Sequence, residues 1–218
     1  MERSIRLFLC SFCLFVSIIA TSQNELTEKQ PFEELAQKLK LKAPKLTEGE
    51  YEIRVWNRQA LMYGDAQSLY VLSKRKKAFK VERYIIAWDG PKFSYATKFN
   101  PTVSITDSLW KKLVEEGLLS WPDETIIEQQ LHPKQPPDST RTSVEPDGSV
   151  SVIARKRKPS VWISDGEGYY IDVISHDLHQ RYRYGNPRAY YQARPDIHEL
   201  RKVVTILNSI SGLFRTVR

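Results

Sequence analysis

The feature that most constrains this chain is an apolar run at its N-terminus, because both of its cysteines lie there. Arg3 and Arg6 precede the 14-residue run from Leu7 to Ala20. Charged, then apolar, then small residues are the order of a secretory signal peptide. The run is shorter than the roughly 20 residues that a membrane-spanning helix needs. We therefore predict a signal peptide over residues 1–22, cleaved after Ser22, and a secreted or periplasmic protein without a transmembrane anchor.

The two cysteines leave a lipoprotein signal as an alternative. An acylated cysteine ends the apolar run and follows small residues, whereas Cys10 and Cys13 lie within the run and Phe12 precedes Cys13. We therefore prefer a cleaved signal. The remaining 196 residues then contain no cysteine, which excludes both disulfides and thiol catalysis. A chain of that length can fold around its apolar core alone, and the lack of cysteine pairs favours a bacterial envelope over an animal secretion.

The charge of the chain bears on its partners. The net charge is +7 for the whole chain and +6 without residues 1–22. Such an excess favours anionic partners, although it also serves solubility. The expected export argues against nucleic acid. We expect a protein or glycan partner, and an anionic envelope component is an alternative.

Alternation of apolar and polar residues predicts two antiparallel meanders. The expected strands are 51–56, 68–73, 79–87 and 92–98 in the first meander, and 150–154, 160–164, 169–175 and 180–184 in the second. In the last strand, alternation places Tyr182 and Tyr184 on one face and Arg181 and Arg183 on the other. The proline-rich segment at about 132–148 is expected to be a loop within a single domain that spans residues 23–218.

Three segments have the spacing of amphipathic helices. They are a short helix within residues 31–39, a mid-chain helix that starts near Thr106 or Asp107 and ends at Gly117, and a C-terminal helix at about 196–214. The predicted fold class is therefore α+β: a mainly antiparallel sheet, with the mid-chain and C-terminal helices packed on it.

Catalytic signatures in this sequence are weak. The least weak candidates are Asp172, His176 and His179, whose side chains are also zinc ligand types. Histidines three residues apart in a turn are far less specific than the helical H-E-x-x-H pattern, so we predict no metal and no cofactor. The chain has neither a G-x-S-x-G motif nor a phosphate-binding glycine loop. We expect a non-enzymatic binding or accessory protein, and a hydrolase of an envelope polymer is the alternative.

Two basic runs lie in predicted connections between strands and are candidate binding residues. They are Lys74, Arg75, Lys76 and Lys77, and Arg155, Lys156, Arg157 and Lys158. If both connections lie at the same end of the sheet, they form a cationic rim for an acidic polymer or for lipid headgroups. A lipid- or polyanion-binding module is therefore a second alternative, although charged turns also keep the ends of a sheet soluble.

A succession of short motifs spans about half of the chain. It runs through Leu109-Trp110-Lys111-Lys112-Leu113, Asp165-Gly166, Tyr169-Tyr170-Ile171-Asp172, Arg181-Tyr182-Arg183-Tyr184 and Asn186-Pro187, followed by an apolar helix. This order resembles that of uncharacterised exported bacterial proteins, which contain a domain of unknown function. The resemblance implies an antiparallel α+β domain and assigns no catalytic residue.

Overall fold

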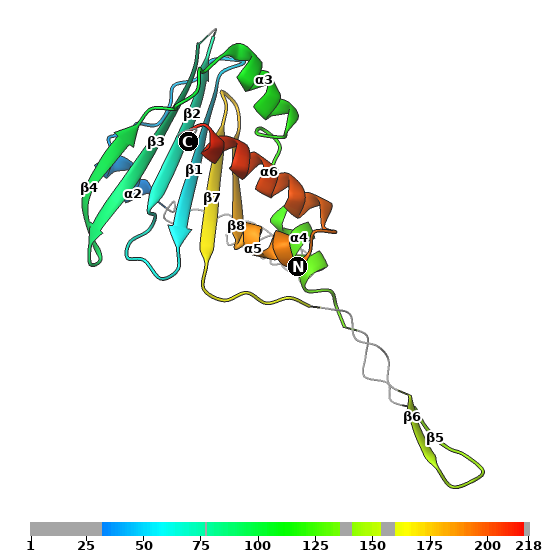
Figure 1. The fold of residues 1–218 in the computed structure, drawn as a ribbon. Coiled ribbons are helices and arrows are strands. Elements are labelled where there is room, and N and C mark those ends of the chain that lie inside the picture. The colour runs from blue at the N-terminus through cyan, green and yellow to red at the C-terminus, as the bar shows by residue number, and fades with distance from the viewer. Residues whose placement is uncertain (1–31, 77, 136–140, 154–159, 216–218) are drawn as a thin grey trace, which may run out of the picture. The chain divides into compact units, whose positions relative to one another are not determined.

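A computed structural model describes residues 32–76, 78–135, 141–153 and 160–215 (Figure 1). The expected signal peptide, Lys77 and the basic run 155–158 lie outside these ranges. The chain divides into two units after Lys42. In the first unit, α2 (Glu33–Lys38) forms where the sequence predicts a short helix, with two glutamates in its first turn and a lysine in its last, an arrangement that the helix dipole favours.

The second unit is built around one antiparallel sheet of six strands, in the order β4-β3-β2-β1-β7-β8. The strands are β1 (Tyr51–Gln59), β2 (Ser68–Arg75), β3 (Ala78–Asp89), β4 (Lys92–Phe99), β7 (Glu167–Ile174) and β8 (His179–Gly185). Strands β1 to β4 form a meander, and the hairpin of β7 and β8 joins it by pairing β7 with β1. A separate hairpin pairs β5 (Arg141–Val144) with β6 (Val150–Ile153).

Four helices pack on one face of the six-stranded sheet, which we call the helix face (Figure 1). They are α3 (Asp107–Glu115), α4 (Glu124–Leu131), α5 (Pro187–Ala193) and α6 (His198–Gly212). Fully buried side chains of α6, including Val203 and Ile206, join Ile53, Val55 and Leu72 of the sheet in one apolar cluster. Tyr184 of β8 and Tyr169 of β7 extend this cluster, and the partly buried Tyr182 of β8 packs against it.

The other side of the sheet, which we call the opposite face, is partly apolar and partly charged. Trp56, Leu69 and Val71 are buried there. The neighbouring Glu52 and Glu82 are also buried. Buried carboxylates need ionic partners, and each of these two has basic ones.

The α+β class and the antiparallel sheet are confirmed, and the C-terminal helix forms close to its predicted range. The predicted strand at 160–164 is wrong, because Val161 and Ile163 pack against the core without joining a sheet ladder. Strand β5 forms inside the expected loop at 132–148. Helices α4 and α5 were not predicted: each is short, and α5 begins at Pro187, within an Asn-Pro pair that is also common in turns.

The packing of α6 gives a direct test of this architecture. Ile206 is completely buried, so Ile206→Ala leaves a cavity under the helix and should lower the free energy of unfolding by about 2–5 kcal/mol. Its neighbour Thr205 is exposed, and Thr205→Ala should change stability by no more than about 0.5 kcal/mol. Urea denaturation followed by circular dichroism measures both values. Equal effects of the two substitutions would contradict the position of α6.

Candidate functional site

The centre of the candidate site is Asp172, on the opposite face of β7. Strand pairing places it between Arg54 of β1 and Arg181 of β8. Its Oδ1 atom lies 2.8 Å from Nε2 of His179 and 3.4 Å from Nε of Arg181. The indole N–H of Trp56 donates a 3.4 Å hydrogen bond to Oδ2. One carboxylate therefore serves three donors from two neighbouring strands.

Two of the three catalytic candidates come together, and the third does not. His179 and Asp172 form a hydrogen-bonded pair across the β7–β8 hairpin. His176 instead lies exposed in the turn between these strands, which is closed by a 2.8 Å hydrogen bond from Ser175 N–H to the carbonyl of Leu178. A functional site built from all three side chains is therefore not assembled.

The edge strand β8 extends the site with basic side chains. His179, Arg181 and Arg183 alternate along it and so share the opposite face. The side chains of His179 and Arg181 are 34% and 44% exposed. The guanidinium of Arg183 lies over the ring of Tyr170, 5.3 Å from its centroid. Alternation alone predicted the separation of the arginines from the core tyrosines, and the register of β7 with β8 confirms it.

Elsewhere on the opposite face, each of two buried glutamates forms ion pairs with two basic side chains. Glu52 forms ion pairs with Arg54 at 2.7 Å and with Arg75 at 2.9 Å. Glu82 does so with Lys80 at 2.8 Å and Lys98 at 2.6 Å.

The chemistry of Glu82 is set by two opposing effects. Burial alone would raise the pKa of Glu82, but the hydrogen bonds and charges of the two lysines outweigh it, so the pKa is lowered. The ionised form is therefore the one that the fold stabilises.

The basic run at the β2–β3 turn is largely occupied by structural contacts. Lys74 forms a 2.5 Å ion pair with Asp107 at the start of α3. Arg75 binds Glu52 and donates a 2.9 Å hydrogen bond to the carbonyl of Tyr51. The side chain of Lys76 is exposed. Because Lys77 and residues 155–158 lie outside the described ranges, the proposed cationic rim stays a prediction.

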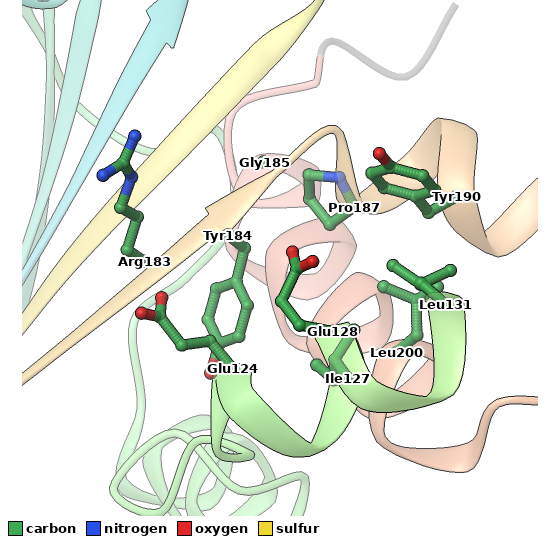
Figure 2. Close-up of a pocket in the computed structure, with 10 residues that line it drawn as sticks. All are labelled: Glu124, Ile127, Glu128, Leu131, Arg183, Tyr184, Gly185, Pro187, Tyr190 and Leu200. Carbon is green, nitrogen blue, oxygen red and sulfur yellow. The ribbon is translucent and has the colours of Figure 1, made fainter. Parts of the chain in front are cut away.

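A small hollow lies between α4, α5 and β8 (Figure 2). Its walls include Glu124, Glu128, Tyr184 and Tyr190, and Arg183 reaches its rim with the guanidinium pointing away. The volume is about 10 Å³, which is room for about one water molecule. Partial burial raises the pKa of Glu124, against the opposing charge of Arg183. The hollow is too small for an organic ligand.

A further group of polar side chains, Glu128, His132 and Ser160, lies at the C-terminal end of α4 and was not predicted from the sequence. Nδ1 of His132 lies 3.0 Å from Oγ of Ser160, and its Nε2 lies 3.6 Å from Oε2 of Glu128. The ring of Trp162, which is 77% exposed, stacks on the imidazole with centroids 3.8 Å apart. The i, i+4 spacing of Glu128 and His132 was the available signal, but nothing in the sequence points to Ser160.

Two further findings concern the described ranges. Within them, no group of three or more His, Cys, Asp or Glu side chains is arranged to hold a metal ion. No helix among the same residues is both long and apolar enough to cross a bilayer.

Comparison of the chain with protein-family models, curated proteins and solved structures finds no match.

The Glu82 cluster gives a pH-dependent prediction. Because its pKa is lowered on folding, the ionised Glu82 stabilises the protein above the ordinary glutamate pKa of about 4.5, and this stabilisation is lost as the pH falls through the folded-state value. Glu82→Gln should therefore cost about 1 kcal/mol at pH 7, a small value because solvent screens the exposed lysines, and less at pH 3. Urea denaturation at both pH values measures this.

The control is Glu115→Gln, which removes one negative charge from an exposed position of α3. It should change stability by less than about 0.5 kcal/mol at either pH. A Glu82→Gln cost that does not shrink between pH 7 and pH 3 would show that the lost stability is not due to the carboxylate charge.

Proposed function

We propose that this protein is a non-enzymatic binding protein that holds an acidic partner, a protein or a glycan, on the β8 side of its opposite face. The observation that carries the proposal is a charge imbalance. By strand register, the opposite face of the sheet holds seven basic side chains against three acidic ones. The basic ones are Arg54, Arg58, Arg75, Lys80, Lys98, Arg181 and Arg183, and the acidic ones are Glu52, Glu82 and Asp172.

The arginines of β8 are the part of this face best suited to a ligand. Arg54 and Arg75 share Glu52, whose side chain is only 11% exposed, so their charges are used within the fold. Arg181 is 44% exposed and shares Asp172 with two other donors. Arg183 rests on the ring of Tyr170, which orients its guanidinium group through a cation–π contact.

The spacing and chemistry of these side chains suit an extended acidic chain. Alternate residues of a strand lie about 6.6–6.8 Å apart, so Arg181 and Arg183 present two planar guanidinium groups in one row. Guanidinium groups bind carboxylates, sulfates and phosphates through paired hydrogen bonds. For an exported chain, as predicted from residues 1–22, the relevant partners are acidic envelope glycans and acidic protein segments.

Charge reversal on β8 tests the proposal. Arg181→Glu with Arg183→Glu should reduce binding to immobilised polyglutamate and polygalacturonate at least about tenfold, because each position changes from attraction to repulsion. Binding of the wild type should weaken as salt rises. Surface plasmon resonance measures both, and the preferred polymer identifies the partner as protein-like or glycan-like.

The matched control is Lys111→Glu with Arg201→Glu, two exposed positions on α3 and α6. It changes the net charge of the protein by the same amount and should retain most of the binding. Equal losses in both double variants would mean that net charge alone drives binding and would refute a β8 site.

A second candidate function, hydrolysis, is favoured by the line of Ser160, His132 and Glu128. A serine within hydrogen-bond reach of a histidine, which a carboxylate orients, is the arrangement that activates a nucleophile. Three features oppose catalysis here. The His132–Glu128 distance of 3.6 Å is long, Trp162 covers one face of the imidazole, and the neighbouring hollow holds about one water molecule.

A fluorophosphonate probe, which reacts with activated serines, separates the two functions. We expect no more labelling of the wild type than of Ser160→Ala. Labelling that both Ser160→Ala and His132→Ala abolish would establish a nucleophilic serine and overturn the non-enzymatic proposal. Because Ser160 is exposed, Ser160→Ala should leave the fold intact.

A further inference from the structure

The loop between β1 and β2 presents three consecutive apolar side chains to solvent. Leu61, Met62 and Tyr63 are 83%, 56% and 69% exposed, and we call them the β1–β2 tip. The loop lies at the end of the sheet, beyond the last residue of β1 (Figure 1). A run of three exposed apolar residues is unfavourable in water and is typical of a surface that contacts another molecule or a membrane.

The fold holds this tip in its exposed position. Trp88 of β3 donates a 2.8 Å hydrogen bond from its indole N–H to the carbonyl of Ala66. Gly64, with φ of +85°, packs so closely on that indole that an added Cβ would lie 2.0 Å from the ring. Gln67 donates a 2.7 Å hydrogen bond to the carbonyl of Tyr63. On the N-terminal side, Ala60 N–H donates a 2.7 Å hydrogen bond to the carbonyl of Gly166. The backbone is therefore held on both sides of the three exposed side chains.

The surroundings of the tip favour a lipid surface over a protein partner. Polar residues adjoin it on both sides: Arg58 and Gln59 before it and Asp65 after it, all exposed. Three protruding side chains are far fewer than the 20–30 residues a side of a stable protein interface. A bilayer interface accepts such a protrusion at a depth of about 5–10 Å. Arg58 and Asp65, which flank the tip in the sequence, carry opposite charges, whereas the tip itself is apolar.

We propose that the β1–β2 tip inserts into the interfacial layer of a lipid bilayer. Leu61 and Met62 lie among the upper acyl chains, and Tyr63 lies at the level of the headgroups, where tyrosine is enriched. This surface is distinct from the arginines of β8, and the inference does not rest on the proposed acidic partner. A protein attached in this way rests on a membrane without spanning it.

The test places a tryptophan reporter at the tip of the full chain. Met62→Trp is compared with Leu178→Trp, at an exposed apolar position in the β7–β8 turn, which lies at the other end of the sheet. On addition of phosphatidylcholine vesicles, emission of the Met62→Trp protein should shift to shorter wavelength relative to wild type and be quenched by brominated lipid. The Leu178→Trp protein should show neither change. Because both chains share the same N-terminus, residues 1–22 contribute equally to both.

A loss-of-binding variant completes the test. Leu61→Asp with Met62→Asp should lower partitioning into these vesicles at least about tenfold, and the ratio should persist at high salt, since apolar insertion is not screened. Leu178→Asp should partition as the wild type does. Equal behaviour of the two reporters overturns the inference, and so does binding that salt abolishes. A shift that grows with protein concentration without vesicles indicates a second copy of the chain and also overturns it.

Discussion

The pairing of β1 with β7 is the interaction on which the rest of this structure depends. It joins residues 52–59 to residues 167–174, more than a hundred positions later in the chain, and turns a meander and a hairpin into one six-stranded sheet. Only this pairing brings Trp56 to Asp172. It also aligns Ile53 and Val55 with Val173 and Ile171. These apolar side chains form part of the core in which α6 packs.

Because the side-chain period of a strand is two, one register decides the chemistry of both faces. The tyrosines of β8 face the helices, so its arginines lie on the opposite face of the sheet. On that face, the carboxylates of the meander and of the β7–β8 hairpin differ in how deeply they are buried. Glu52 and Glu82 are nearly buried and hold their bases within the fold, whereas Asp172 is more exposed and stands beside an open row of basic side chains. The same alternation that builds the core therefore places a row of basic side chains on the edge strand, with Asp172 and Glu124 as acidic neighbours.

Local patterns predicted much of the fold. Two kinds of pattern were visible in the sequence alone: the alternation around Ile53 and in the last strand, and the apolar spacing from Leu200 to Ile210. Each arises because one side of the strand or helix packs on the core and the other does not. Residues 160–164 mislead for the same reason: Val161 and Ile163 alternate because they pack on the core from one side, and alternation does not report whether a ladder partner exists. The pairing of β1 with β7 could not be predicted from the sequence, because no local pattern in either strand specifies which strand it pairs with.

The candidate sites were predicted less well than the fold, and the reason is physical. A run such as Lys74 to Lys76 looks free in a sequence because its partners, Asp107 and Glu52, come from other elements. Alternation in β8 separated its arginines from its tyrosines, but it did not indicate that the arginines belong to a site. Whether a charge is available to a ligand depends on where its nearest carboxylate lies in space. A count of basic residues along the chain therefore does not rank the turn against the strand, because their acidic partners are known only once the register of the sheet is known.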